Sequence, residues 1–599
     1  MIGQPAVACA VTLLDLHSHR YAVDITVNTP AAVQRVSLPV WIPGSYLVRE
    51  FSRHLQQLRA RQGRRALAVR QLDKNTWEVD CKVATPLRLR YEIVAFDNSV
   101  RAAWLDAARG FFNGTSMFLR VHGQETLAHR LELSRAGAPP GWQVATALGA
   151  VQAAADGFGV YRADNYAQLM DSPVEMGRFW QGNFICRGVP HRMVVAGAPA
   201  TFDGARLLAD TQRICEAVMA FWHGAADGAR GTRQVPHENY VFMLNAVDDG
   251  YGGLEHCNST ALICARKDLP RLGGAKAGDA VPRQPDGYPT LLGLISHEYF
   301  HTWNIKRLRP AEFASYDYDR ENYTQLLWFF EGFTSYYDEL LVRRCGLADD
   351  GQYLKQLTRT INQVLQAPGR LVQSVAQASF DAWVKYYRHD ENTPNATISY
   401  YSKGAAVALC LDLSLRSQGK ITLDAVMRGL WRRCKAGPMA QDDLLQVLHE
   451  LSGTDWSAQI AQWVHGTTEL PLKELLLQHG VAVLEEPAQL AQALGLRVVE
   501  SGGVVLKTVL RGSAAEQAGM AAGDEWMGIE NADAQSADQC WRITRLDEIA
   551  VYASAGQPIV ALVARDKRLL RLRLQLPAAV TTWRLAVGDA AVLARWLAG

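Results

Sequence analysis

The sequence predicts a soluble multidomain protein with an N-terminal β-rich domain, a central mainly α-helical domain and a C-terminal α+β domain. Its 599 residues are enough for three or four domains of about 150 residues each. The apolar pattern is strand-like near the N-terminus, takes a helical period from about residue 203, and returns to strands after about residue 480. We therefore expect domains at residues 1–170, 171–480 and 481–580, followed by an extension at 581–599.

The N-terminal part contains short strand-like stretches separated by Pro, Gly and Asn turns, which is typical of a β-sandwich-like domain. The central part has apolar residues three and four apart in Leu207–Trp222, and a strand-like stretch interrupts it at residues 239–244. The other strands and helices expected from these patterns are Tyr21–Val27, Val36–Trp41, Thr76–Val79, Leu87–Val94, Tyr323–Cys345, Ser402–Ser417 and Gln441–Leu451.

The C-terminal part is expected to form strands at Val504–Val509, Ile559–Val563 and Leu569–Leu576. Between the first two lies the string GSAAEQAGMAAGDEW, which begins at Gly512 and resembles the pattern of a PDZ domain. Its Gly519 and Gly523 suit backbone positions that need a positive φ. The resemblance implies a PDZ-like domain that binds peptide C-termini. The final stretch, Asp589–Leu597, is expected to form a short amphipathic helix.

Composition excludes several classes of partner. The 62 Lys and Arg are balanced by 60 Asp and Glu without basic or acidic blocks, so neither nucleic acid nor an anionic membrane is expected to bind. No apolar run approaches the ~20 residues that a membrane-spanning helix requires. The ten cysteines contain no CxxC pair, which favours reduced thiols and a cytoplasmic location.

The strongest chemical signal is the string HEYFH, which begins at His297. Residues four apart on a helix lie one above the other, so the imidazoles of His297 and His301 can reach one metal ion while Glu298 projects beside it. This geometry is typical of zinc sites. The alternative is two unconnected histidines on a mostly apolar helix.

A catalytic zinc ion usually has three protein ligands and one open position for water. Glu331 is the best candidate for the third ligand, because it lies in the apolar segment LWFFEGFT, where a carboxylate is costly to bury unless it is paired or binds a metal. The alternative is a carboxylate on a solvated helix face. Asp338 lies two turns further along the same face and is either a residue that orients one of the histidines or a surface residue.

Two further segments are candidates for substrate contacts. In the string YGGLEH, Gly252 and Gly253 would let a strand edge approach an extended peptide, and Glu255 would bind its positive amine. A simple turn is the alternative. At the start of a later helix, Tyr401 is placed to donate a hydrogen bond to the oxyanion of a tetrahedral intermediate, although most tyrosines serve only in packing.

Taken together, the segments GGLEH, HEYFHTWN, WFFEGFTSYYDE and YYSKGAA resemble those of the gluzincin metallopeptidases, and specifically the glycyl aminopeptidase family with a C-terminal PDZ domain. The strings LPVWIPGSYLVREFSRH and NIKRLRP resemble further signatures of that family. The resemblance covers about residues 10 to 580 and implies a thermolysin-like fold for the central domain.

The roles implied by the resemblance are zinc binding by His297, His301 and Glu331, general-base catalysis by Glu298, binding of the substrate amine by Glu255 and stabilisation of the transition state by Tyr401. Two features depart from the pattern of the large aminopeptidases. The spacing between the second histidine and the glutamate ligand is longer than is usual there, and His256 stands where those enzymes commonly have Asn.

We therefore expect a zinc-dependent aminopeptidase that holds one Zn²⁺ per chain and removes N-terminal residues from peptides with a free N-terminus. The resemblance also implies a preference for Gly or Ala as the first residue. Two alternatives stay open at this point: a zinc endopeptidase whose PDZ-like domain selects substrates, and a non-catalytic peptide-binding scaffold of the PDZ type. Zinc content distinguishes the scaffold from both enzymes, and peptides with blocked N-termini distinguish the two enzymes.

Overall fold

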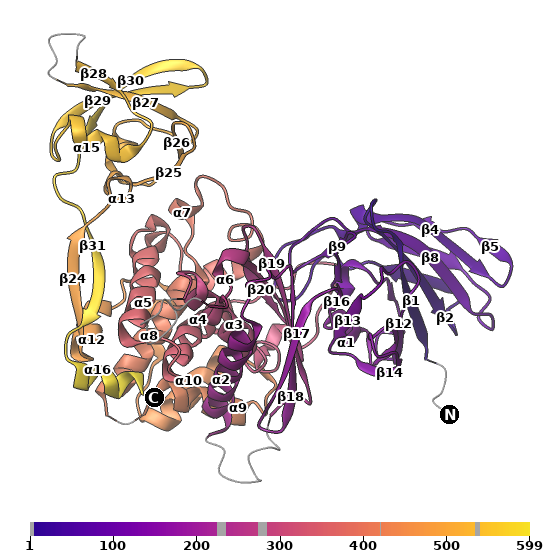
Figure 1. Ribbon diagram of the computed structural model, residues 1–599. Coiled ribbons are helices and arrows are strands. Elements are labelled where there is room, and N and C mark those ends of the chain that lie inside the picture. The colour runs from indigo at the N-terminus through magenta and orange to yellow at the C-terminus, as the bar shows by residue number, and fades with distance from the viewer. Residues whose placement is uncertain (1–4, 225–234, 274–283, 420, 533–538, 599) are drawn as a thin grey trace. The chain divides into compact units, whose positions relative to one another are not determined.

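The computed structural model describes residues 5–224, 235–273, 284–419, 421–532 and 539–598 (Figure 1). The chain folds into two compact units. The first unit comprises Met1–Tyr323 with the short segments Cys345–Leu347 and Trp431–Ala440. The second unit comprises Thr324–Arg344, Ala348–Leu430 and Gln441–Gly599.

The first unit begins with a β-rich domain, as the sequence predicts. Its strands are β1 Val7–Asp15, β2 Arg20–Val27, β3 Val33–Ser37, β4 Leu55–Gln62, β5 Arg65–Leu67, β6 Arg70–Gln71, β7 Thr76–Asp80, β8 Leu87–Val94, β9 Ala103–Leu105, β10 Arg109–Phe112, β11 Arg120–Val121, β12 His129–Leu133, β13 Gln143–Thr146, β14 Gly149–Ala153, β15 Gly159–Ala163 and β16 Val174–Gly177. They form one sheet of eight strands in the order β14-β15-β12-β1-β2-β8-β4-β5 and two of four strands, β13-β16-β10-β9 and β11-β3-β7-β6. A short helix, α1 Tyr166–Met170, precedes β16.

Alternating burial explains why these segments form sheets. In β8 every second side chain from Leu87 to Ile93 is buried in the core, while those between them face outward or are only partly covered. The expected strand at Val36–Trp41 is wrong in its bounds, because β3 ends at Ser37. Proline at position 39 has no N–H to donate to a ladder, so the strand cannot continue through it.

The first unit continues with a further sheet, of five strands, and two long helices. The strands are β17 Trp180–Cys186, β18 Val189–Ala196, β19 Tyr240–Val247, β20 Tyr251–Glu255 and β21 Ser259–Ala265, and the helices are α2 Gly204–His223 and α3 Tyr288–Phe300. The sheet order is β17-β18-β19-β21-β20, with β20 antiparallel at one edge. Helix α3 packs against β20 and β21, so this edge of the sheet positions the helix that carries HEYFH.

The second unit is mainly helical over its first half. Its helices are α4 Leu327–Arg344, α5 Asp350–Leu365, α6 Val375–Phe380, α7 Thr393–Ala396, α8 Tyr400–Ser417, α9 Leu423–Arg433, α10 Gln441–Ser452, α11 Ser457–Ile460 and α12 Leu472–Gln478, of which the last turn of α9 belongs to the first unit. The expected helix at Tyr323–Cys345 begins later, at Leu327. The Thr324 hydroxyl accepts a hydrogen bond from the Leu326 N–H, and this local turn replaces the first helical turn.

Helices α4 and α8 approach each other closely at two glycines. A Cβ placed on Gly332 would lie 2.4 Å from the Cα of Gly404, and a Cβ on Gly404 would lie 2.3 Å from the carbonyl oxygen of Trp328. No other residue type fits at either position without moving a backbone. Glu331 and Tyr401 lie beside this crossing on the two helices.

The C-terminal part of the second unit contains β-sheet, as the sequence predicts. Its elements are β24 Val481–Pro487, α13 Leu490–Leu494, β25 Leu496–Glu500, β26 Val504–Val509, α14 Ala514–Gln517, β27 Glu525–Asn531, β28 Cys540–Arg542, α15 Ile549–Tyr552, β29 Pro558–Arg565, β30 Arg568–Gln575, β31 Thr581–Val587 and α16 Ala590–Leu597. Strands β25 to β30 form one sheet with its own apolar core around Trp526. Gly519 and Gly523 have φ of 81° and 88°, which confirms their expected positive φ.

The expected C-terminal helix is confirmed as α16. Its Trp596 donates from Nε1 to the hydroxyl of Tyr336 on α4 at 3.2 Å, so the end of the chain packs back on the helical part of the second unit. Across the described ranges, none of the helices combines the length and the apolar character needed to cross a lipid bilayer.

We predict that Gly332→Ala lowers the free energy of unfolding by about 1–3 kcal/mol, because the added methyl group overpacks the crossing of α4 and α8. Denaturant unfolding of the full chain measures this effect. Gly149→Ala is the matched control, since a Cβ there meets no heavy atom within 4 Å. Equal stability of the two variants would show that the helices can separate at little cost.

Candidate metal centre

Helix α3 ends at the two histidines of the HEYFH string. Its apolar residues, including Leu292 and Ile295, are buried and fix the helix on the sheet. The Nε2 atoms of His297 and His301 lie 3.0 Å apart, and the two rings are nearly perpendicular. Two nitrogens bound at 2.0–2.1 Å to one tetrahedral zinc ion would lie about 3.3 Å apart. The predicted convergence of the two imidazoles is therefore present in the structure.

A backbone carbonyl sets the tautomer of His301. Its Nδ1 lies 2.8 Å from the carbonyl oxygen of Asn304, to which the Nδ1–H donates. This bond leaves the lone pair on Nε2, the atom that faces His297, and such a partner is usual for a metal-binding histidine. Sequence reasoning missed Asn304, because the contact involves its main chain and depends on the turn that follows α3.

Two glutamates of the first unit lie beside His301. Glu255, at the end of β20, and Glu298, on α3, are each 5% exposed. Together with His301 they offer ligand atoms that all lie within 4.8 Å of one another. The structure thus brings together four residues that the sequence singles out, His297, His301, Glu298 and Glu255.

Glycines make room for both carboxylates. A Cβ on Gly253 would lie 2.1 Å from Oε1 of Glu298, so β20 passes directly over this carboxylate. A Cβ on Gly44 would lie 2.5 Å from Oε2 of Glu255, and Gly44 has a φ of 92°, which favours glycine. Gly252, at a φ of 150°, also has a backbone conformation that favours glycine. Sequence reasoning missed Gly44, although it lies in the quoted string LPVWIPGSYLVREFSRH.

Strand β20 lies at the edge of its sheet. Among the described strands it pairs only with β21, so its other side has no neighbouring strand. An edge strand can add an extended peptide by main-chain hydrogen bonds. Tyr251, at the start of β20, is 63% exposed. The GGLE segment therefore lies on an edge strand, and its part in binding a peptide stays a prediction.

The remaining predicted residues lie in the second unit. Glu331 is 2% exposed in α4, and Tyr401 lies in the first turn of α8. Burial raises the pKa of Tyr401 well above its usual value, and the Glu331 carboxylate adds to this effect, so the phenol keeps its proton. Asp338, further along α4, accepts a hydrogen bond from the N–H of Glu339. The role of Glu331 as the third zinc ligand, beside the two histidines of the first unit, stays a prediction.

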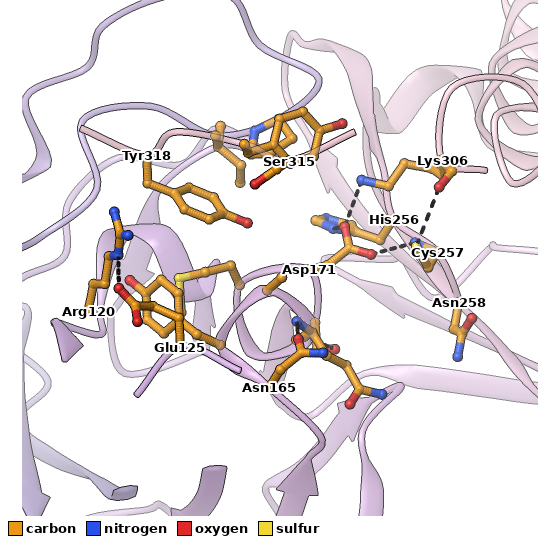
Figure 2. A pocket seen from close by; sticks show the side chains of 18 of the residues that line it. Arg120, Glu125, Asn165, Asp171, His256, Cys257, Asn258, Lys306, Ser315 and Tyr318 are labelled. Carbon is orange, nitrogen blue, oxygen red and sulfur yellow. Dashed lines mark hydrogen bonds and ion pairs between the residues drawn. The ribbon is translucent and has the colours of Figure 1, made fainter. Parts of the chain in front are cut away.

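A buried ion pair lies next to the candidate centre and was not expected from the sequence. Lys306 Nζ lies 2.7 Å from Oδ1 of Asp171, which also interacts with Nδ1 of His256 at 3.1 Å (Figure 2). The other Asp171 oxygen accepts from the Cys257 N–H at 2.8 Å. The turn after Glu255 is therefore held by Asp171. Lys306 lies in the quoted segment NIKRLRP, but nothing in the sequence marks Asp171 as its partner.

Two family models match the chain. The model of the peptidase M61 N-terminal domain matches residues 8–178, and the model of the M61 glycyl aminopeptidase matches residues 290–407. The first match spans the β-rich domain through β16, and the second spans α3, α4 and the first turns of α8. Among proteins with curated functional descriptions, none matches the chain.

Solved structures are also similar to this chain, and one of them covers nearly its full length. The crystal structure of an aminopeptidase N family protein from Idiomarina loihiensis is 35% identical, with a TM-score of 0.89, over 99% of this chain and 100% of that chain. An M1 zinc metallopeptidase from Deinococcus radiodurans is 15% identical, with a TM-score of 0.46, over 78% of this chain and 94% of that chain. A mutant of that M1 enzyme bound to a Tyr-Ser-Ala substrate is 16% identical, with a TM-score of 0.46 and the same coverage.

The 35% identity extends over nearly the whole length of both chains, and the two family models match separate parts of this one. The chain therefore belongs to the M61 glycyl aminopeptidase family of zinc metallopeptidases.

Proposed function

We propose that this protein is a zinc-dependent aminopeptidase in which His297, His301 and Glu331 bind one Zn²⁺ per chain. The observation that carries the proposal is the convergence of the two histidine Nε2 atoms at 3.0 Å beside the buried carboxylate of Glu298. Two imidazole nitrogens and one carboxylate oxygen are a donor set that zinc prefers and that leaves a fourth position open. Membership of the M61 family supports the same assignment.

The reaction is peptide hydrolysis with Glu298 as the general base. A bound zinc ion supplies Lewis acidity to water and to the scissile carbonyl. The Glu298 carboxylate accepts a proton from the attacking water and returns it to the amine that leaves. Its burial beneath Gly253 fixes the carboxylate in one place and keeps bulk water away from it. Tyr401, which keeps its proton, donates a hydrogen bond to the oxyanion of the transition state.

Glu255 selects substrates with a free N-terminus. Its carboxylate lies at the end of an edge strand, where an extended peptide would finish. There it would accept charge-assisted hydrogen bonds from a protonated amine. Gly252 and Gly253 keep this strand free of side chains along the path of the peptide. The enzyme therefore removes single residues from the N-terminus and does not cleave within a chain.

Finer features of the proposal rest on the family resemblance and on the sequence. The preferred first residue is Gly or Ala, Asp338 orients one of the histidines, and the sheet at 481–580 is a PDZ-like domain that binds peptide C-termini. The domain bounds are 1–170, 171–480 and 481–580, with an extension at 581–599. The enzyme works in the cytoplasm, as the lack of a CxxC pair in the sequence favours.

Glu298→Gln tests the proposed base. We expect the variant to keep about one zinc per chain and to lose about 10²- to 10⁴-fold in kcat on a free-amine dipeptide, because the amide cannot accept the proton of water. Metal analysis by atomic absorption and steady-state kinetics on the same preparation measure both quantities. If the variant loses its zinc but keeps its rate per bound ion, the assigned roles are wrong.

Glu255→Gln tests the proposed binding of the substrate amine. The substitution keeps the volume beneath Gly44 and removes the charge, so the ratio of kcat/KM for free-amine over N-acetylated peptides should fall about 10- to 100-fold. Glu132→Gln, at an exposed position on β12, is the control and should leave the ratio unchanged. Equal losses on both peptides would favour an endopeptidase, in which Glu255 has only a structural role.

Gly253→Ala tests whether the position of the Glu298 carboxylate limits the reaction. The new methyl group would occupy the space of Oε1, so the carboxylate must move, and a displacement of about 1 Å can cost about 100-fold in kcat. Zinc content and the melting temperature should change little. Gly149→Ala again serves as the control. A fully active Gly253→Ala variant would show that Glu298 can act from more than one position.

A further inference from the structure

A second cavity lies in the first unit, next to the candidate metal centre but without its residues. Its volume is about 590 Å³, and it is lined by residues of the N-terminal domain, of the turn after β20 and of the segment that follows α3. None of the residues that line it is a proposed zinc ligand, the proposed base or Glu255. A cavity of this size can hold a small organic molecule.

The cavity and the candidate centre lie on opposite sides of the end of β20. Successive residues of an extended strand point to opposite faces, so His256 points away from the side to which Glu255 points. His256 is 1% exposed and lines the cavity, where its ring points toward the hydroxyl of Tyr318 (Figure 2). Its Nδ1 contacts Asp171, but within the described ranges its Nε2 has no hydrogen-bond partner.

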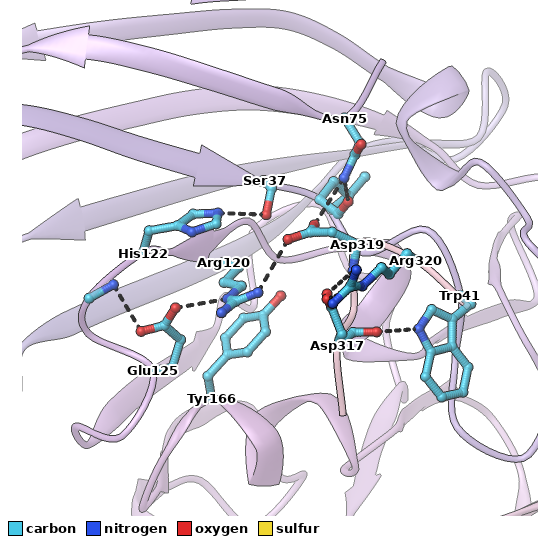
Figure 3. Close-up of polar contacts among 12 residues, drawn as sticks. Ser37, Trp41, Asn75, Arg120, His122, Glu125, Tyr166, Asp317, Asp319 and Arg320 are labelled. Atoms are coloured by element: carbon cyan, nitrogen blue, oxygen red, sulfur yellow. Dashed lines mark hydrogen bonds and ion pairs between the residues drawn. The ribbon is translucent and has the colours of Figure 1, made fainter. Parts of the chain in front are cut away.

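Most charges that line the cavity are compensated by neighbours. Lys306, which is 5% exposed, pairs with Asp171. Arg120 donates to Glu125 at 2.8 Å and to Asp319 at 3.2 Å (Figure 3). Both carboxylates that line the cavity therefore already have a cationic partner.

Arg309 is the exception among the cations that line the cavity. Its guanidinium donates to the carbonyl oxygens of Lys306 at 2.7 Å and of Arg307 at 3.5 Å, and it pairs with no carboxylate of the described residues. The Tyr318 hydroxyl, which is directed into the cavity, likewise makes no hydrogen bond within the described part of the chain. Besides Nε2 of His256, the cavity wall thus offers, among the described residues, a guanidinium without a carboxylate partner and a hydroxyl without a hydrogen bond. These two donors suit an anion.

We propose that this cavity is a binding site for a small organic carboxylate, separate from the site of the peptide amine. A guanidinium presents two parallel N–H donors that match the two oxygens of a carboxylate. The Tyr318 hydroxyl supplies a further donor, and apolar residues such as Ile42, Pro43 and Met170 cover the rest of the ligand. Neither the proposed zinc ligands nor the proposed catalytic groups take part, so this site does not depend on the proposed peptidase activity.

The test is calorimetric titration of the zinc-loaded full-length protein with succinate at constant ionic strength. We expect saturable binding of one succinate per chain. Arg309→Gln should weaken it about 10- to 100-fold, and Tyr318→Phe about 2- to 10-fold. Arg309→Lys keeps the charge and loses the paired donors, so its affinity for succinate should lie between those of wild type and Arg309→Gln. Arg130→Gln, at an exposed position outside the cavity, should bind like wild type.

Three outcomes would overturn the proposal. The first is the absence of saturable binding by wild type, or equal affinity in wild type, Arg309→Gln and Tyr318→Phe. The second is binding that disappears when the metal is stripped yet survives in Arg309→Gln, since succinate would then sit on the zinc ion. The third is saturable binding of inorganic phosphate without binding of succinate. If Arg309→Gln does not fold, Tyr318→Phe and the position of succinate in a soaked crystal decide the question.

Discussion

The candidate site depends on the cost of burying three glutamates almost completely. Glu255 and Glu298 are each 5% exposed, and Glu331 is 2% exposed. An ionised carboxylate kept from water costs several kcal/mol unless a cation, a metal or several donors compensate it. Glu255 and Glu298 offer oxygens within 4.8 Å of each other, so their mutual repulsion adds to this cost. A metal ion at the proposed ligands and an amine at Glu255 would be attracted by this group of carboxylates.

The glycines of the sequence motifs follow from this constraint. Gly253 and Gly44 leave the space that the carboxylates of Glu298 and Glu255 occupy, so they serve close approach of backbone to side chain. Gly332 has a comparable role in the second unit, where it allows α8 to approach α4 next to Glu331. In each case the glycine lies within two residues of a predicted functional residue or directly against it. The glycine of GGLEH thus makes room for the carboxylate of another segment, and the glycine of FFEGF makes room for a neighbouring helix.

The sequence predicts those features that depend on short-range order. The pairing of His297 with His301 follows from the period of one helix, and the strands and helices with a clear apolar pattern are confirmed, including α16. The wrong bounds of two elements have local causes that an apolar pattern does not reveal. A proline ends β3, and a turn at Thr324 makes α4 begin later than expected. Contacts between distant segments, such as the ion pair between Asp171 and Lys306, could not be predicted from the sequence.

That ion pair holds distant segments of the chain together. Asp171 follows α1, Lys306 follows His301, and the N–H of Cys257 follows Glu255, so one carboxylate joins three segments. Burial is the largest single effect and would raise the pKa of Asp171 and lower that of Lys306. The attraction between the two groups, together with smaller contributions such as that of His256 to Asp171, outweighs burial in both cases. The pKa of the aspartate is therefore lowered and that of the lysine is raised.

The stabilisation that this pair provides is consequently lost only as pH falls through the lowered pKa of Asp171 or rises through the raised pKa of Lys306. Between these limits both groups stay charged, and loss of either partner would leave a buried charge at a cost of about 3–5 kcal/mol. The turn that carries Glu255 is thus anchored independently of pH over the neutral range. The titration of this ion pair therefore adds nothing to the pH dependence of peptide hydrolysis near neutrality.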